Sequence, residues 1–227
     1  YIITDSKTKG DKILNVDNSN LFLNNLATNF RKRLETKFIG ITGTNGKTST
    51  KEFLLQMLKT KFNVSCSRGN YNSLISMPLS VLECNENSDF CILEMGASKK
   101  GDIKELLNIA KPNIVALLNV SPAHLDTFGT LENILSTKEE IFLNQGFDKK
   151  VILNKSDQYF DRWVRKNKLN NIITISKDDQ TADYSAVKAS DKELSVKTPY
   201  EPEFKLRVVN AESHNILNIL FSIALAS

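Results

Sequence analysis

Short apolar runs alternate with amphipathic stretches along most of the chain. Continuous apolar runs predict strands that are buried on both faces, and they occupy residues 38–41, 90–93, 114–119, 151–154 and 172–175. The stretches between them have helical spacing, over residues 48–61, 77–82, 101–110, 131–144 and 158–166. This alternation predicts an α/β fold, in which a mostly parallel sheet is flanked by helices and ligands bind at the carboxyl ends of the strands.

The pattern changes at both ends of this region. Residues 1–20 contain one short strand and little more, and residues 21–34 predict an amphipathic helix. Residues 184–209 consist of short alternating pieces between polar turns, which predict a small antiparallel addition. A last helix is expected over residues 213–226. Because the chain begins without methionine and ends within a helical pattern, we expect it to be an excerpt of a longer protein.

Composition narrows the class of protein. A chain of 227 residues with 41% hydrophobic and 25% charged residues is typical of a soluble globular protein. A net charge of +4 is too small to indicate nucleic-acid binding, and the basic cluster Arg31-Lys32-Arg33 is expected to be a solvated helix face. No apolar stretch reaches the roughly 20 residues that span a bilayer. Three cysteines without metal-type spacing predict a reduced, cytoplasmic protein, with Cys91 in the core.

The segment after the first buried strand has the composition of a phosphate-binding loop. It reads Gly43-Thr44-Asn45-Gly46-Lys47-Thr48. Glycines let backbone N–H groups approach a phosphate, the following helix N-terminus adds positive potential, and Lys47 supplies a full charge. The Thr48 hydroxyl can then bind Mg²⁺. Ile41 replaces the first glycine of the general pattern, so this loop is of a particular kind.

Two charged or titratable residues follow other predicted strands. Glu94 comes directly after strand 90–93, and such a carboxylate facing a phosphate loop either holds a hydrated Mg²⁺ or is simply solvated. His124 is one of two histidines and lies in the loop after strand 114–119. It can belong to a site or be structural, and its place at the strand ends favours the site.

Three further residues carry weaker signals. Asn70 and Asn72 lie in a turn cluster, which either binds a polar substrate or only turns the chain. Lys138 lies on the helix predicted over residues 131–144. By spacing alone it is an ordinary surface lysine.

Taken in order, six motifs resemble the Mur ligases, which build the peptide of bacterial cell-wall precursors. They are the loop 43–48, Gly69-Asn70-Tyr71-Asn72, Glu94-Met95-Gly96-Ala97, the segment 123–129, Lys138-Glu139-Glu140-Ile141-Phe142 and His214-Asn215-Ile216-Leu217-Asn218. The resemblance implies that residues 36–227 are the central, P-loop ATPase-like domain of that family. Residues 1–35 would be the tail of an N-terminal UDP-substrate domain and its connecting helix, and the C-terminal, amine-presenting domain would be absent.

The resemblance also implies an activity. The paired asparagines and the Glu94-Met95-Gly96-Ala97 segment are most similar to the member that adds D-alanyl-D-alanine. It implies an ATP-dependent, amide-forming ligase that joins UDP-MurNAc-tripeptide to D-Ala-D-Ala through an acyl phosphate, with ATP and Mg²⁺ as cofactors. The implied protein is a cytoplasmic monomer without a nucleic-acid partner or membrane insertion. We expect the excerpt alone to bind Mg-nucleotide weakly and to form no product.

The resemblance assigns catalytic roles to residues of this sequence. Lys47 would hold the β- and γ-phosphates, Thr48 and Glu94 the first Mg²⁺, and His124 would help with the second. Lys138 matches a lysine that is carbamylated in the family. Carbamylation requires a neutral amine, hence a lowered pKa, and it yields an anionic oxygen ligand for Mg²⁺.

Binding roles and departures complete the comparison with the family. Asn215 and Asn218 match positions near the adenine, and Asn70 and Asn72 match positions that face the sugar-peptide substrate. This chain has Ser73, Ser76 and Glu212 where that member usually carries asparagine, glycine and glycine. These changes concern the fit of the substrate and of the adenine, not the phosphate chemistry.

Other functions share parts of the pattern. Within the class, diaminopimelate- or lysine-adding ligases favour Glu-Xaa-Ser-Ser where this chain has Glu94-Met95-Gly96-Ala97, and folylpolyglutamate synthetases usually have Gly-Lys-Gly in the loop. A non-catalytic nucleotide-binding module would not need Lys138. A P-loop GTPase is favoured only by Asn154-Lys155-Ser156-Asp157, which spells a base-reading motif and follows a strand.

Overall fold

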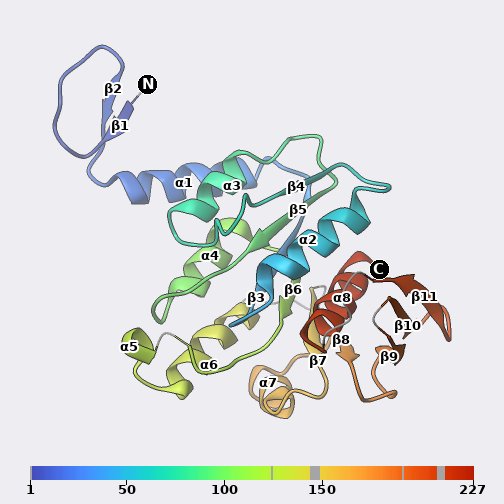
Figure 1. Ribbon diagram of the computed structural model, residues 1–227. Coiled ribbons are helices and arrows are strands. Elements are labelled where there is room, and N and C mark those ends of the chain that lie inside the picture. Colours follow the sequence, from blue (N-terminus) through green and yellow to red (C-terminus); the bar gives the residue numbers. More distant parts are fainter. Residues whose placement is uncertain (1, 124, 144–148, 191, 209–212) are drawn as a thin grey trace.

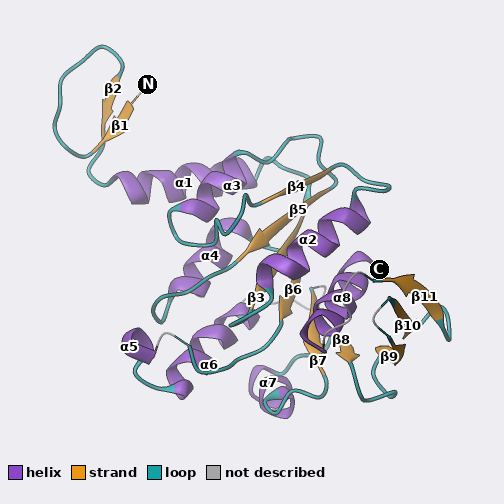
Figure 2. Ribbon diagram, viewed as in Figure 1, coloured by secondary structure: helices purple, strands orange, loops and turns teal. Residues whose placement is uncertain are grey.

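The computed structural model describes residues 2–123, 125–143, 149–190, 192–208 and 213–227. Among these residues, a nine-stranded sheet with the order β11-β10-β9-β8-β7-β6-β3-β5-β4 forms the centre of the molecule (Figure 1). Every neighbouring pair from β4 to β9 is parallel, and helices lie on both faces (Figure 2). The predicted α/β fold with a mostly parallel, helix-flanked sheet is therefore confirmed.

The strands of this sheet are β3 (Lys37–Thr42), β4 (Val64–Cys66), β5 (Phe90–Glu94), β6 (Ile114–Leu117), β7 (Lys150–Asn154), β8 (Ile172–Ser176), β9 (Tyr184–Ala189), β10 (Glu193–Lys197) and β11 (Phe204–Arg207). The helices are α1 (Ser19–Arg31), α2 (Lys47–Leu58), α3 (Ser76–Leu82), α4 (Asp102–Ala110), α5 (Leu125–Phe128), α6 (Leu131–Glu139), α7 (Phe160–Asn167) and α8 (Ser213–Ala226), with a 3₁₀ turn η1 (Glu140–Phe142) after α6. None of these described helices is long and apolar enough to cross a membrane.

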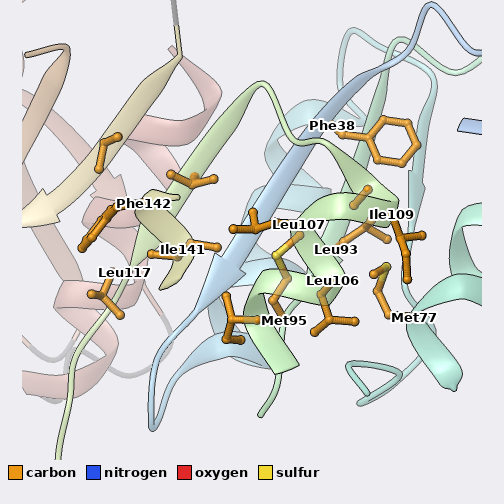
Figure 3. Close-up of a cluster of buried hydrophobic side chains, with 14 of the residues drawn as sticks. Phe38, Met77, Leu93, Met95, Leu106, Leu107, Ile109, Leu117, Ile141 and Phe142 are labelled. Atoms are coloured by element: carbon orange, nitrogen blue, oxygen red, sulfur yellow. The ribbon is translucent and has the colours of Figure 1, made fainter. Parts of the chain in front are cut away.

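The apolar strands are continuous because each one supplies two cores. Side chains alternate between the faces of a strand, so Phe38 enters one core while Ile39 enters the other. The first core lies between the sheet and α1, α3, α4, α6 and α7, and Figure 3 shows β5 and α4 side chains of it packed together. The second core lies under α2 and α8, which pack against each other.

The predicted antiparallel addition is part of the main sheet. Strand β9 pairs with β8 in parallel, with Ile175 opposite Tyr184, and only β10 and β11 add antiparallel pairs. Tyr184, Leu194 and Val196 are buried in the second core, so the same hydrophobic layer continues into this region. The sheet therefore ends in an antiparallel meander rather than in a separate unit.

The N-terminal region contains one strand more than the sequence predicts. The strands β1 (Ile2–Thr4) and β2 (Ile13–Asn15) form a separate two-stranded parallel sheet beyond α1 (Figure 1). A strand of three residues with a half-exposed pattern carries no recognisable period in the sequence.

The basic cluster at the end of α1 is only partly solvated, which corrects the prediction. The Arg31 guanidinium is half-buried, lies over the Phe38 ring with its carbon 3.9 Å from the ring centroid, and donates from Nε to the carbonyl of Ala110 at 2.7 Å. It thus satisfies a carbonyl at the end of α4 and joins α1 to the first core. Lys32 and Arg33 are exposed, as expected, and Cys91 is fully buried.

Candidate active site

The phosphate loop, residues 43–48, connects the end of β3 to the start of α2. Gly46 has a φ of +85°, a conformation that favours glycine, and a Cβ at this position would collide with the side-chain amide of Asn218. Its carbonyl accepts the hydrogen bond from Thr50 N at 2.9 Å that begins the helical ladder. The loop therefore leads its N–H groups directly into a helix N-terminus, which is suited to bind phosphate.

The Lys47 side chain lies over this loop. Its Nζ donates to the carbonyls of Gly43 at 2.7 Å and Thr44 at 3.1 Å. Burial lowers the pKa of Lys47, while the charge of Glu94 acts in the opposite direction. Thr48 is exposed beside it. The Lys47 ammonium group is thus bound to loop carbonyls, and a rotation of its side chain would bring it to a phosphate in the loop.

Asn119, after β6, braces the loop, a role that the sequence did not predict. Its Oδ1 accepts from Asn45 N at 3.0 Å, and its Nδ2 donates to Asn45 O at 3.1 Å. Its own carbonyl accepts from Thr44 N at 3.0 Å. The Thr44 hydroxyl also accepts from Ser121 N at 3.1 Å. The only indication of this role in the sequence is that Asn119, an amide residue, follows a buried strand.

Asn218 supports the loop from the other side. It is buried, its Oδ1 accepts from the Thr50 hydroxyl at 3.3 Å, and its amide packs against Gly46. Asn215, one turn earlier on α8, lines a separate cavity of about 300 Å³ with Phe53 and Met57. The predicted adenine role of these two asparagines remains a prediction. His124 and Glu212 lie outside the described residues.

Glu94 ends β5 below the loop and is completely buried. Its Oε1 lies 3.1 Å from the Lys51 Nζ but receives no well-directed hydrogen bond, and its Oε2 accepts from Asn72 Nδ2 at 3.4 Å. A buried carboxylate oxygen without a hydrogen-bond donor is suited to a cation. The residues present therefore fit Mg²⁺, an ion that prefers oxygen ligands.

The described residues contain no group of three or more Asp, Glu, His and Cys that could enclose a metal. A Mg²⁺ ion bound together with a nucleotide does not need such a group, because it uses one or two protein carboxylates together with phosphate and water oxygens. Thr48 and Glu94 would then be the protein ligands within the described part of the site.

Asn72 is held against the Glu94 carboxylate. Besides its bond to Glu94, its carbonyl accepts from Gly96 N at 2.7 Å, and a side chain at Gly96 would collide with the Asn72 amide. Asn70 is exposed. Of the two predicted substrate asparagines, Asn72 is thus bonded to Glu94. The Asn70 side chain has no hydrogen bond among the described residues.

Ser73 and Ser76, two of the departures, form a reciprocal cap at the start of α3. The Ser73 hydroxyl accepts from Ser76 N at 3.2 Å, and the Ser76 hydroxyl accepts from Ser73 N at 3.1 Å. This is the arrangement of a capping box. The two added hydroxyls are therefore used to begin the helix.

A cavity of about 400 Å³ opens beside the loop and is lined by some of the predicted residues. Its lining includes Lys47, Asn72, Asp102 and Lys138. Lys138 is only 6% exposed, so the expectation from spacing of a surface lysine is wrong. Burial and the neighbouring Lys47 charge lower its pKa to about 8, against the opposing effects of Asp102 and Glu140. A neutral amine at Lys138 is therefore accessible near physiological pH.

Two cations of α7 bind a buried carboxylate on the helix that carries Lys138. The next residue, Glu139, is 4% exposed and accepts from Arg162 Nε on α7 at 2.8 Å. Lys166 contacts the other oxygen of Glu139. Arg162 also binds Glu132, which lies about two helical turns earlier on α6. These bonds attach α6 to α7, and Lys138 on the same helix lines the cavity.

The base-reading pattern at residues 154–157 forms a turn after β7. Asn154 Oδ1 accepts from Ser156 N at 3.1 Å, and Asp157 Oδ1 accepts from Tyr159 N at 2.9 Å. Strand β6 separates β7 from the strand of the phosphate loop. The two side chains that would read a guanine are thus engaged in the local turn.

The chain is similar to known proteins over most of its length. The Mur ligase middle domain family matches residues 41–226. The UDP-N-acetylmuramoyl-tripeptide--D-alanyl-D-alanine ligase of Rickettsia prowazekii is 40% identical over 152 residues, which are 67% of this chain and 34% of that relative. The aligned part of this chain thus corresponds to about a third of the length of that relative.

Two solved structures have the same fold. MurF from Acinetobacter baumannii superposes with a TM-score of 0.90 at 26% identity, over 99% of this chain and 50% of that one. MurF from Thermotoga maritima, solved in complex with ADP, gives a TM-score of 0.85 at 30% identity, over 98% of this chain and 52% of that one. Both neighbours therefore share the fold of this chain over nearly its whole length.

Proposed function

This chain belongs to the Mur ligase family, and on that premise we propose that it is the ATP-binding part of a ligase that joins D-alanyl-D-alanine to UDP-N-acetylmuramoyl-tripeptide. The observation that carries the proposal is the convergence of Lys47, Glu94 and Lys138 around the phosphate loop and its cavity. The name of the similar enzyme from Rickettsia supports this choice of substrates. Residues 36–227 would form the central domain, and residues 1–35 would lead in from a substrate-binding domain.

ATP would bind along the phosphate loop. The N–H groups at the start of α2 and the Lys47 cation are suited to the β- and γ-phosphates. The ADP complex of the Thermotoga neighbour supports a nucleotide in this fold. On this proposal, Asn119 and Asn218 do not touch the phosphates but keep the loop in its binding conformation.

Thr48 and Glu94 would hold the first Mg²⁺ at this loop, and His124 would help to hold a second. The bound ion would neutralise charge on the transferring phosphoryl group. The chain's own part is to hold the completely buried Glu94 side chain close to Lys47 of the phosphate loop.

Lys138 would provide a further oxygen ligand as its carbamate. Its burial and its pKa of about 8 favour the neutral amine that combines with carbon dioxide. The carbamate would lie in the 400 Å³ cavity, between the phosphate loop and Asn72.

The proposed reaction has two steps. A carboxylate oxygen of the tripeptide attacks the γ-phosphorus of ATP, and the bond to the β-bridging oxygen breaks to release ADP. The amine of D-Ala-D-Ala then attacks the acyl carbon, loses a proton, and expels phosphate to leave an amide. Lys47 and the loop N–H groups would stabilise the negative charge that develops on the phosphoryl oxygens.

A cytoplasmic monomer is the proposed working state. The three cysteines are free, which is typical of proteins in a reducing compartment where ATP is available. Sedimentation of the protein at enzymatic concentrations checks the monomer.

Nucleotide binding and substrate dependence test the proposal. Calorimetry on this chain should detect ADP and ATP binding that depends on Mg²⁺, and much weaker GTP binding. Tighter GTP binding would favour the GTPase alternative. In the full-length protein, phosphate release from ATP should require both UDP-MurNAc-tripeptide and D-Ala-D-Ala. Release with diaminopimelate or lysine in place of D-Ala-D-Ala would overturn the substrate assignment, and no release at all would favour a non-catalytic module.

A further inference from the structure

Lys51 is a completely buried lysine one helical turn beyond Lys47 on α2. Its Nζ lies 3.1 Å from Glu94 Oε1 and donates to the carbonyls of Ser67 at 2.9 Å and Gly69 at 2.6 Å. A buried ammonium group is costly unless it is paired and hydrogen-bonded, and here it has both. The ion pair and the two hydrogen bonds together compensate the cost of burying the Lys51 ammonium group.

The site contains two lysine cations with different partners: Lys51 pairs with Glu94, and Lys47 binds loop carbonyls. Glu94 is close enough to influence Lys47 as well, because its charge acts on the pKa of that amine. With Lys51 in place, the buried carboxylate is compensated from below. Lys47 then rests on neutral carbonyls of Gly43 and Thr44 rather than on a carboxylate, and it is available for phosphate.

Lys51 also fixes the segment between β4 and α3. We define the Gly69 loop as residues 67–72. Ser67 N donates to Ile92 O at 2.9 Å, and Asn72 donates to Glu94 at the other end. Between these two attachments to β5, the Lys51 ammonium binds the Ser67 and Gly69 carbonyls. One cation thus connects the carboxylate to the first half of the Gly69 loop, whose last residue, Asn72, lines the cavity.

We propose that Lys51 is a positioning residue that aligns Glu94 for the metal ion and couples this carboxylate to the Gly69 loop. It acts through Glu94 and the loop and touches neither nucleotide nor substrate. This inference rests on the proposed function, since it gives a role to the carboxylate of the nucleotide site. Removing Lys51 should weaken metal binding and release the loop together, because a single ammonium group serves both.

The Lys51→Met variant tests the proposal, since methionine retains an unbranched chain without the charge or the donors. Calorimetry on this chain should give a Mg²⁺ requirement for ADP binding that is higher by about 10- to 100-fold, the range found when partners of metal ligands are removed. ADP affinity without Mg²⁺ should fall as well, because an uncompensated Glu94 attracts the Lys47 cation away from the phosphates. Amide hydrogen exchange, measured without nucleotide, should become faster across residues 67–72.

Two matched variants control for charge and for helix composition. Glu52→Gln removes the half-exposed carboxylate that also lies 3.3 Å from Lys51 and should change neither readout. Lys59→Met removes an exposed cation at the end of the same helix and should likewise change neither. If Lys59→Met reproduces the effects of Lys51→Met, a general change in charge explains them and the proposal is wrong.

An uncompensated Glu94 can prevent Lys51→Met from folding. In that case the double variant Lys51→Met/Glu94→Gln is compared with Glu94→Gln alone, which keeps Lys51 and its bonds to the loop carbonyls. Faster exchange of residues 67–72 only in the double variant supports the coupling. Equal exchange in the two overturns it.

Failure of this inference differs from failure of the proposed function. If the unaltered chain shows no Mg²⁺-dependent ADP binding, the nucleotide function fails and the metal part of the inference fails with it. If the unaltered chain binds ADP with Mg²⁺ and a folded Lys51→Met variant has the same Mg²⁺ requirement, only the inference about Lys51 is wrong.

Discussion

Gly46 is the residue of the phosphate loop at which a side chain is least tolerable. Gly46→Ala adds a Cβ in the left-handed region and drives it into Asn218. We expect the free energy of unfolding to fall by about 1–3 kcal/mol from overpacking, in addition to the backbone strain. ADP affinity, measured by calorimetry, should fall at least tenfold because the loop N–H groups move.

Gly69→Ala is the matched control for this variant. Gly69 also has a positive φ, of +46°, but a Cβ there meets nothing within 4 Å. It should therefore show the backbone strain alone and leave ADP affinity nearly unchanged. Equal losses in the two variants would mean that the Asn218 contact has no part in shaping the loop.

The Lys138 amine makes stability depend on pH. Its folded-state pKa of about 8 lies below the ordinary value of 10.5, so between these pH values the unfolded chain binds more protons than the folded one. Stability from this group therefore rises with pH from about 8 to 10.5. Urea unfolding in carbon dioxide-free buffer should show this rise, and Lys138→Met should lack it. A rise of the same size in both proteins would contradict the lowered pKa.

The same amine determines when a carbamate can form. At pH 7 a lysine of pKa about 8 is neutral in roughly one molecule in ten, against fewer than about one in a thousand for an ordinary lysine. At constant dissolved carbon dioxide, NMR with isotopically labelled bicarbonate should therefore detect a carbamate that increases from pH 7 to pH 9. The signal should be absent from Lys138→Met.

Lys138→Ala tests the carbamate as a ligand. In the full-length protein we expect ligation to be abolished, because an anionic oxygen near the metal is lost. Added short carboxylates such as acetate should restore part of the rate by occupying the space left in the cavity. Full activity of the unassisted variant would remove Lys138 from the site.

At the scale of elements, α6 and α7 are joined by charge. Arg162→Ala removes the Nε donor of the buried Glu139 and both bonds to Glu132. Lys166 still contacts Glu139, so we expect a loss of about 1.5–3 kcal/mol, the value of hydrogen bonds to charged groups. Urea denaturation measures this loss.

Arg165→Ala on the same helix is the control. Arg165 pairs with Asp161 at 3.6 Å, and both side chains are about four-fifths exposed. Such a pair contributes less than about 0.5 kcal/mol. A loss from Arg165→Ala as large as that from Arg162→Ala would show that burial of Glu139 is not the deciding feature.

At the scale of the whole molecule, the sheet joins two cores. Its strands send alternate side chains to either face, so neither core can unfold while the other keeps its strands. Trp163, the one tryptophan of the chain, is completely buried in the first core beside Phe142 and Tyr159. Its fluorescence and far-UV circular dichroism should therefore report the same unfolding transition.

A substitution in the second core tests this coupling. Leu54 on α2 is completely buried on the face opposite Trp163, and Leu54→Ala should cost about 2–5 kcal/mol. Both signals should shift to the same lower urea midpoint. Leu21→Ala, at an exposed position of α1, should shift neither. A Leu54→Ala midpoint that moves for dichroism but not for Trp163 would mean that the faces unfold separately.

The sequence by itself determined the alternating strands and helices and the phosphate loop. These features depend on residues close in the chain: apolar runs, helical spacing, and glycines before Lys47 and Thr48. Glu94 was found for the same reason, as a charge directly after a buried strand. The burial of Cys91 and the outer antiparallel strands also followed from local pattern, although their continuity with the main sheet did not.

Tertiary structure alone decided the surroundings of the site residues. Lys138 has the spacing of a surface lysine, but it is buried and lines the cavity. Its neighbour Glu139 is bound by Arg162 and Lys166 from another helix. Lys51, with no special pattern in the sequence, is paired with Glu94 from a strand that is distant in the chain. Burial, pairing and pKa depend on which segments meet in space, and local periodicity carries no information on that. The sequence thus specifies the elements and the loop, while packing gives the charges of the site their partners.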